Sequence, residues 1–200
     1  MAAGMRGGEA VRGGGDEPAA GDPGRLVRAD ARRNVEALVQ AARRMFEAEG
    51  VDAPMRQIAD AAGVGVGTLY RHFPRRADLI VAVFRHEVEA CAEAAALLAA
   101  AHPPAEALRL WVDRYVALIA AKRGLAGALH GDEAAYEGLP AWFEARLSPA
   151  LDGLLRKAGG RGGAADLLWA IASLCVPPRH GDTARSGRMI ALLLEAVLGA

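Results

Sequence analysis

The stretch from Pro54 to Phe73 constrains the fold more than any other part of the chain, because its apolar residues and glycines define two short helices and a turn. Proline is tolerated in the first turn of a helix, where its missing N–H costs no hydrogen bond, so Pro54 indicates a helix start. Gly63 indicates the end of that helix, since glycine readily adopts the left-handed conformation that follows a helix. A second apolar pattern begins at Val66. The sequence therefore predicts two short helices joined by a tight elbow.

Such a pair resembles the helix-turn-helix, in which the second helix presents its N-terminal residues to the major groove of DNA. The outward positions of the second helix include a hydroxyl, a phenol, a guanidinium and an imidazole, all of which can donate to phosphates or base edges. These positions are Val66, Gly67, Thr68, Tyr70, Arg71 and His72. The competing interpretation is an ordinary alanine-rich hairpin whose aromatic residues fill a core, and Phe73 fits that interpretation.

The run GVGVGTLYRHF ends at Phe73 and is followed by Pro74, two arginines, Ala77, Asp78 and Leu79. It is similar to the signature of the TetR family of bacterial transcriptional regulators, and the resemblance runs from about Ala31 to Ala90. The resemblance implies an all-α fold, with an N-terminal three-helix DNA-binding domain joined by a long helix to a C-terminal helical domain for ligand binding and dimerisation.

The resemblance also implies roles for single residues. Arg56 and Thr68 are expected to contact bases or nearby phosphates. Tyr70 and His72 are expected to clamp the DNA backbone. Arg75 and Arg76, at the start of the next helix, are expected to contact phosphates. Val66 departs from the family pattern, which often has a polar or basic residue at this position. The groove helix therefore offers fewer donors, and contact with thymine methyl groups is one substitute.

Charge supports a local rather than a global attraction to DNA. The chain has 24 basic and 24 acidic residues, so its formal net charge is zero and no overall field draws it to nucleic acid. Many arginines nevertheless precede residue 80, whereas acidic residues dominate the stretch from Asp132 to Glu137. The arginines in question are Arg32, Arg33, Arg43, Arg44, Arg56, Arg71, Arg75 and Arg76.

Residues 1–29 form an N-terminal extension that we expect to be disordered, because it is rich in glycine and scattered charge and poor in large apolar residues. It lacks the apolar run of a signal peptide. The later apolar stretches are interrupted by charge, glycine or proline, so no membrane span is predicted and we expect a cytoplasmic protein.

Helical periodicity predicts helices through the rest of the chain, and the resemblance implies a DNA-binding domain at 30–77 and a ligand-binding and dimerisation domain at 78–200. The first helix should run from about Asp30 to Glu49, and a long helix should follow Asp78 and link the two domains. Further helices are expected up to residue 198. Pro149 should kink or divide the helix that contains it, because it removes a backbone donor and crowds a carbonyl one turn earlier.

The last two helices, expected at 164–176 and about 183–198, carry broad apolar stripes. In the family that the chain resembles, these helices pair with their symmetry mates, and a two-fold dimer suits a palindromic operator. An ordinary core helix is the alternative. We expect a homodimer whose interface contains Leu167, Ile171, Leu174, Ile190, Leu193, Leu194 and Val197.

Aromatic residues are spread over several helices of the C-terminal region. A cavity lined by aromatic side chains between bundle helices is a common ligand site, although each residue alone could simply fill the core. The resemblance implies an inducer site there for an unknown small hydrophobic or aromatic molecule. The candidates are Trp111, Tyr115, Tyr136, Trp142, Phe143 and Trp169.

Catalytic chemistry is hard to find in the sequence. Cys91 and Cys175 lie far apart in apolar surroundings, the histidines lack metal-ligand spacing, and the glycines near residue 160 lack the lysine of a phosphate loop. We therefore expect no catalytic residue, no metal and no cofactor. The leading hypothesis is a ligand-released repressor that binds double-stranded operator DNA. A helical enzyme or scaffold with a regulator-like N-terminal domain is the alternative, and activation in place of repression stays open.

Overall fold

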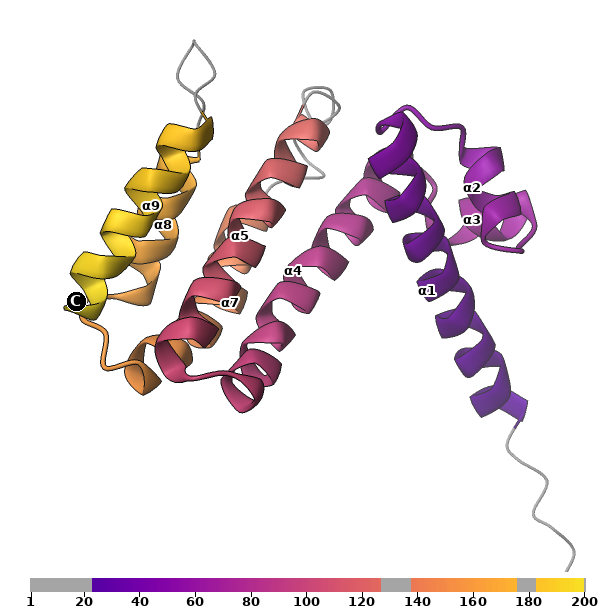
Figure 1. Cartoon of the computed structure of the whole chain (residues 1–200). Helices are drawn as coiled ribbons and strands as arrows, with labels where there is room; N and C mark the ends of the chain where they lie inside the picture. The colour runs from indigo at the N-terminus through magenta and orange to yellow at the C-terminus, as the bar shows by residue number, and fades with distance from the viewer. Residues whose placement is uncertain (1–22, 127–137, 176–182, 200) are drawn as a thin grey trace, which may run out of the picture.

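The computed structural model describes residues 23–126, 138–175 and 183–199, and these residues form helices and connecting turns without a strand (Figure 1). The all-α prediction is confirmed. The helices are α1 (Pro23–Glu49), α2 (Met55–Ala61), α3 (Val66–His72), α4 (Arg76–Ala101), α5 (Pro104–Ala126), α7 (Leu139–Lys157), α8 (Ala164–Leu174) and α9 (Thr183–Leu198).

Two separate apolar cores organise these helices. The first core lies among α1, α2, α3 and the beginning of α4, and it includes Leu38, Ile58, Leu69 and Val83. The second core begins at Phe84 and joins the rest of α4 to α5, α7, α8 and α9. Packing therefore divides the chain between Val83 and Phe84, inside α4, and not at the predicted boundary of 77 and 78.

Helix α1 begins at Pro23, well before the predicted start at Asp30. The expectation of disorder over 1–29 is therefore wrong for residues 23–29, while residues 1–22 lie outside the described part of the chain. The physical reason is that proline suits the first position of a helix, where its fixed φ is already helical and its missing N–H is not needed. The glycine-rich composition of the N-terminal region instead predicted disorder at these residues.

The second core is fixed by hydrogen bonds from buried aromatic side chains. The indole Nε1 of Trp111 donates to the carbonyl oxygen of Cys91 at 2.8 Å, which ties α5 to α4. The phenol of Tyr115 donates to the carbonyl oxygen of Leu168 at 3.1 Å, which ties α5 to α8. These bonds satisfy polar atoms that burial would otherwise make costly. Helices α8 and α9 lie at the end of the molecule opposite α2 and α3 (Figure 1).

Helix α7 runs without a break through Pro149, so of the two effects predicted for this proline, a kink or a division, the division does not occur. Pro149 and Ala145, the residue one turn earlier whose carbonyl loses its partner, are both exposed. Solvent can therefore hydrate that carbonyl. On the opposite side Leu147 and Leu151 are fully buried on either side of the proline, and they hold both halves of the helix in the same core.

Candidate nucleic-acid interface

The turn between α2 and α3 depends on a glycine in a left-handed conformation. Gly63 has a φ of 69°, a value that residues with a Cβ atom rarely adopt. Its N–H donates to the carbonyl oxygen of Asp60 at 3.1 Å, and the N–H of Val64 donates to that of Ala59 at 3.0 Å. Helix α3 then begins after Gly65, whose carbonyl oxygen accepts the N–H of Thr68 at 2.9 Å. Both helices lie inside the predicted motif at 54–73.

Buried residues on one side of each short helix fix how α3 faces solvent. Ile58, Ala59 and Leu69 are completely buried in the first core, and Phe73 is nearly so. Because Ala59 carries only a methyl group, it lets the two helices approach closely. The opposite side of α3 is consequently held outward.

The outward side of α3 presents the residues that the sequence predicted there. Val66 is 42% exposed and Tyr70 is 48% exposed, which is unusual for large apolar or aromatic side chains. Gly67 and Arg71 are also exposed, as is Arg56 on α2, while Thr68 and His72 are half-buried. We call the set Arg56, Val66, Gly67, Thr68, Tyr70, Arg71 and His72 the reading surface. Gln57 is exposed beside Arg56, and its outward amide is a further donor and acceptor that the sequence reasoning did not single out.

Arg75 and Arg76 have different surroundings although they are adjacent. Arg75 is exposed and caps α4 together with Asp78: its Nη2 donates to Asp78 Oδ1 at 2.6 Å, and its backbone N–H donates to Oδ2 at 3.0 Å. The hydrogen bond from the Arg75 side chain lowers the pKa of Asp78. Arg76 is half-buried, and its Nη1 donates to the carbonyl oxygens of Val51 and Ala53 at 2.7 and 2.6 Å. Arg76 thus holds the α1–α2 loop, and its predicted phosphate contact stays a prediction.

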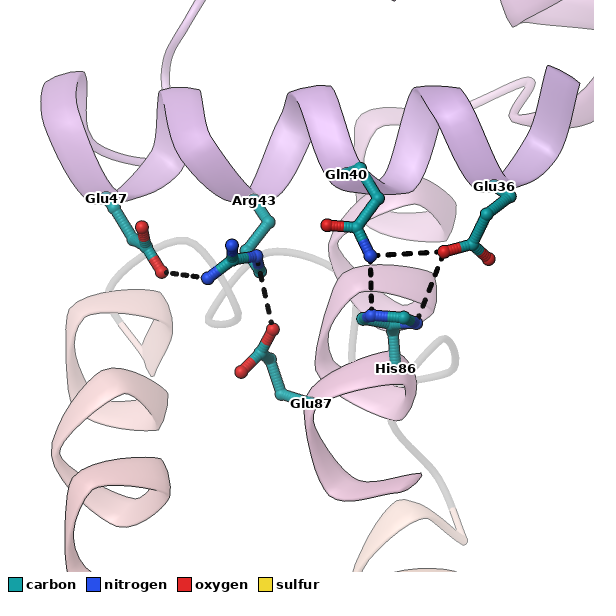
Figure 2. Close-up of polar contacts among 6 residues, drawn as sticks. All are labelled: Glu36, Gln40, Arg43, Glu47, His86 and Glu87. Carbon is teal, nitrogen blue, oxygen red and sulfur yellow. Dashed lines mark hydrogen bonds and ion pairs between the residues drawn. The ribbon is translucent and has the colours of Figure 1, made fainter. Parts of the chain in front are cut away.

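Other arginines near the N-terminus are engaged within the protein. Arg43 lies between two carboxylates, with Nη1 2.9 Å from Oε1 of Glu47 and Nε 3.5 Å from Oε1 of Glu87 on α4 (Figure 2). Arg33 pairs with Asp30 on its own helix. These ion pairs therefore reduce the positive charge that the arginines before residue 80 leave available for DNA.

The predicted ligand residues do not all lie together. Trp111, Tyr115 and Phe143 are brought together, with the Tyr115 ring stacked on that of Trp111 at 5.8 Å and tilted against that of Phe143 at 5.9 Å. The guanidinium of Arg85 lies 5.2 Å from the ring centre of Trp142. Tyr136 lies outside the described residues.

Trp169 does not join this group, because its side chain is 75% exposed. The prediction that it lines an internal pocket of its own subunit is therefore wrong. Two residues correspond to about 200° around a helix, so Trp169 faces almost opposite to Ile171, which is fully buried.

The predicted dimer residues contribute to the second core of their own chain. The four buried residues are Leu167, Ile171, Ile190 and Leu194, and the three partly buried residues packed against this core are Leu174, Leu193 and Val197. The strongest apolar stripe of each helix thus faces the core of its own chain, and a contact of these residues with another subunit stays a prediction. The large apolar side chains exposed on α8 and α9 are Trp169, Met189 and Leu192.

Metal and membrane sites can be examined for the described residues only. Within residues 23–126, 138–175 and 183–199, no group of three histidine, cysteine, aspartate or glutamate side chains is arranged to hold a metal ion. In the same ranges, every helix is too short or too polar to span a bilayer. Cys91 and Cys175 are free thiols.

Comparisons with known proteins agree with this architecture. Residues 38–83 match the tetR family of bacterial regulatory proteins, a range that ends at the last residue of the first core. An HTH-type transcriptional regulator of Staphylococcus aureus is 38% identical over 64 residues, which are 32% of this chain and 35% of that protein. The chain therefore matches about a third of the length of this curated relative.

Two crystal structures extend the similarity over most of the chain. A TetR transcriptional regulator from Streptomyces coelicolor is 34% identical with a TM-score of 0.66, covering 82% of this chain and 97% of that one. A TetR regulatory protein from Mycobacterium vanbaalenii is 36% identical with a TM-score of 0.62, covering 86% of this chain and 98% of that one. With its helix-turn-helix, its two cores and this similarity, the chain belongs to the TetR family of bacterial transcriptional regulators.

Proposed function

We propose that the protein is a ligand-released repressor that binds a palindromic operator as a homodimer. The observation that carries the proposal is the reading surface, in which Tyr70 and Arg71 are held outward on α3 while Leu69 is completely buried beneath them. A helix that is anchored on one side and presents donors on the other suits insertion into the major groove.

The side chains of the reading surface, together with Arg75 beside it, have proposed tasks. The hydroxyl of Thr68 and the guanidinium of Arg56 contact bases or nearby phosphates, while Tyr70 and His72 hold the DNA backbone. Arg71 and Arg75 add charge-assisted contacts to phosphates. Val66, at the exposed start of α3, provides the apolar contact that suits a thymine methyl group.

Dimerisation is proposed through the exposed apolar side chains of α8 and α9. Trp169, Met189 and Leu192 lie on these two helices, at the end of the molecule opposite α2 and α3 (Figure 1). Large apolar side chains that a folded chain leaves exposed are typical of an interaction surface, and these three are proposed to form one face. A two-fold axis through this face would turn one reading surface toward each half of a palindrome, with half-sites about 34 to 36 Å apart.

Ligand release is proposed through the second core. Proteins of this family bind small molecules as well as DNA. Trp111 and Tyr115 lie in the middle of α5, and Trp142 and Phe143 lie near the beginning of α7. Helix α4 connects this region to the helix-turn-helix, since its Phe84 stacks on Phe143. An apolar or aromatic ligand that favours another position of α4 would change the spacing of the two reading surfaces and so lower operator affinity.

The experiment that tests the function begins with the operator. DNA fragments of the native genome bound by the purified chain should share an inverted repeat. Binding of that repeat by two chains per duplex, measured by gel shift and light scattering, supports the proposal. Failure to enrich any sequence above background, with protein shown to be folded by circular dichroism, would contradict it.

A further inference from the structure

A cavity lies at the junction of the two halves of the molecule, outside the aromatic group around Trp111. It has a volume of about 250 Å³ and is bounded by the C-terminal part of α1, the middle of α4 and the later part of α5. Its apolar walls include Phe46 from α1, Val83 and Phe84 from α4, and Leu118 from α5. Apolar cavities of about 150 Å³ bind benzene, so this one has room for a single ring with a short substituent.

Among the side chains that the structure describes, those at the rim of the cavity carry more negative than positive charge. Glu47, Glu87 and Arg43 all line it, and Arg43 lies between the two carboxylates at 2.9 and 3.5 Å (Figure 2). One guanidinium opposite two carboxylates leaves an excess of one negative charge at the rim. Both carboxylates retain access to solvent, with 62% of the Glu47 side chain and 35% of the Glu87 side chain exposed. A cation can therefore reach them.

Two further features favour a cation. Gly50, which directly follows α1, lines the cavity, and the last turn of α1 contains no basic residue to offset the negative end of the helix dipole. The rings of Phe46 and Phe84 can also attract a cation through their negative faces. Arg76 contacts the carbonyl oxygen of Val51 nearby, but its side chain does not line the cavity.

We propose that this cavity binds a small organic ammonium ion. Its apolar ring lies among Phe46, Phe84 and Leu118, and its ammonium group lies beside Glu87 and Glu47. Phe46 and Val83 belong to the first core, whereas Phe84 and Leu118 belong to the second. A molecule bound here would thus contact both the DNA-binding half and the C-terminal half. The inference goes beyond the proposed function, because ligand binding at this cavity does not require that the protein binds DNA and is measured without DNA.

The test uses the full chain and three probes of similar size. The 2-phenylethylammonium ion should bind one per chain by isothermal titration calorimetry. The neutral analogue 2-phenylethanol should bind more weakly, and the anion 3-phenylpropanoate should bind most weakly. Equal affinity for the three probes, or no saturable heat with the ammonium ion at millimolar concentration, would overturn the proposal.

Charge variants test the rim. Glu87→Gln should weaken binding of the ammonium ion about threefold to fivefold, as expected for one partly exposed ion pair, and should leave 2-phenylethanol unchanged. Arg43→Gln should act in the opposite direction, because it removes the cation that competes for both carboxylates. If both variants changed the affinity in the same direction, the ammonium group would not lie at this rim and the proposal would be wrong.

A size variant tests the position. Ala121 lines the cavity from α5, so Ala121→Leu should fill part of the volume and abolish binding of both 2-phenylethylammonium and 2-phenylethanol. Ala105 is exposed in the first turn of the same helix, and Ala105→Leu is the matched control that should bind like the original chain. Thermal melting of each variant checks that it is folded. Undiminished binding by Ala121→Leu would place the ligand elsewhere and overturn the proposal, whatever the protein does with DNA.

Discussion

The guanidinium of Arg76 donates through Nη1 to the carbonyl oxygen of Val51 at 2.7 Å, although the two residues are 25 positions apart in the chain. The same nitrogen donates to the carbonyl oxygen of Ala53 at 2.6 Å. The first residue of α4 therefore holds the loop that leads from α1 into α2. This contact makes the orientation of the helix-turn-helix depend on α4.

Arg76→Ala should lower the free energy of unfolding by about 1 to 3 kcal/mol, because two carbonyl groups lose a charged donor. Denaturation with urea, followed by circular dichroism, measures the change. The matched control is Arg75→Ala at the neighbouring position, where the capping contact is exposed and the loss should be smaller. A larger loss for Arg75→Ala than for Arg76→Ala would contradict the bracing role.

Tyr70→Ala and Arg56→Ala should each weaken operator binding by about 1 to 3 kcal/mol while leaving the melting temperature nearly unchanged, since both side chains are exposed. A gel-shift titration with the selected operator measures the affinity. Arg156→Ala on α7 is the control for loss of a positive charge, because its side chain is 75% exposed and lies outside the reading surface. Normal operator binding by both test variants would show that the reading surface is wrongly assigned.

Leu192→Glu should convert the proposed dimer to single chains without unfolding them, because Leu192 is 64% exposed in the isolated chain. A charge placed there stays in water when the dimer separates but would be buried and unpaired within it. Light scattering at micromolar concentration measures the mass, and circular dichroism measures the helix content.

Ile171→Glu provides the contrast on the neighbouring helix. Ile171 is completely buried in the second core, so a carboxylate there should destabilise or unfold the chain itself. If Leu192→Glu kept the mass of a dimer, or if the original chain had the mass of one subunit, α8 and α9 would not form the proposed interface.

The stability of the protein should depend on Cys91 at alkaline pH. Burial raises the pKa of the Cys91 thiol from 9.0 to about 11. The folded state therefore holds this proton more tightly than the unfolded state, and the resulting stabilisation is complete below pH 9 and is lost as the pH rises to about 11. At most about 3 kcal/mol is involved, given 1.36 kcal/mol for each pKa unit.

Cys91→Ala isolates this contribution. Burial is also the main cause that raises the pKa of Tyr115, and this part of its effect is common to both proteins and cancels in the comparison; the smaller part that comes from the charge of Cys91 is lost with the thiol and belongs to the measured difference. The difference in unfolding free energy between the original chain and Cys91→Ala should shrink between pH 9 and pH 11. A difference that stayed constant over this range would show that the thiol is not protected by burial.

The sequence predicted best where single residues have only one structural interpretation. Pro54 and Gly63 bracket α2 because one suits a helix start and the other a left-handed helix end, and α3 begins at Val66 as expected. The exposure of Tyr70 followed from its position relative to Leu69 and Phe73. The end of α1 at Glu49 is also as expected, and Gly50, which follows it directly, has a left-handed φ of 85°.

Sequence periodicity was insufficient where two apolar faces compete. On α8 it identified Ile171 as an apolar anchor, but it could not decide whether the anchor meets its own core or another subunit. Aromatic character alone does not indicate direction, so it cannot predict that Trp169 lies on the opposite, exposed face. The cavity at Phe46, Val83 and Leu118 joins residues from three helices, so no local pattern predicted it.

Helix α4 places Val83 in the first core and Phe84 in the second. A chain shortened to residues 23–77 would therefore lack Leu79, Ile80 and Val83 and would leave the apolar surface of its remaining helices uncovered. The shortest independently folding DNA-binding fragment should extend at least through Val83. In the full chain the continuous α4 belongs to both cores, so the unfolding of either core removes part of the support of the other. Heat should accordingly melt both halves in a single cooperative transition.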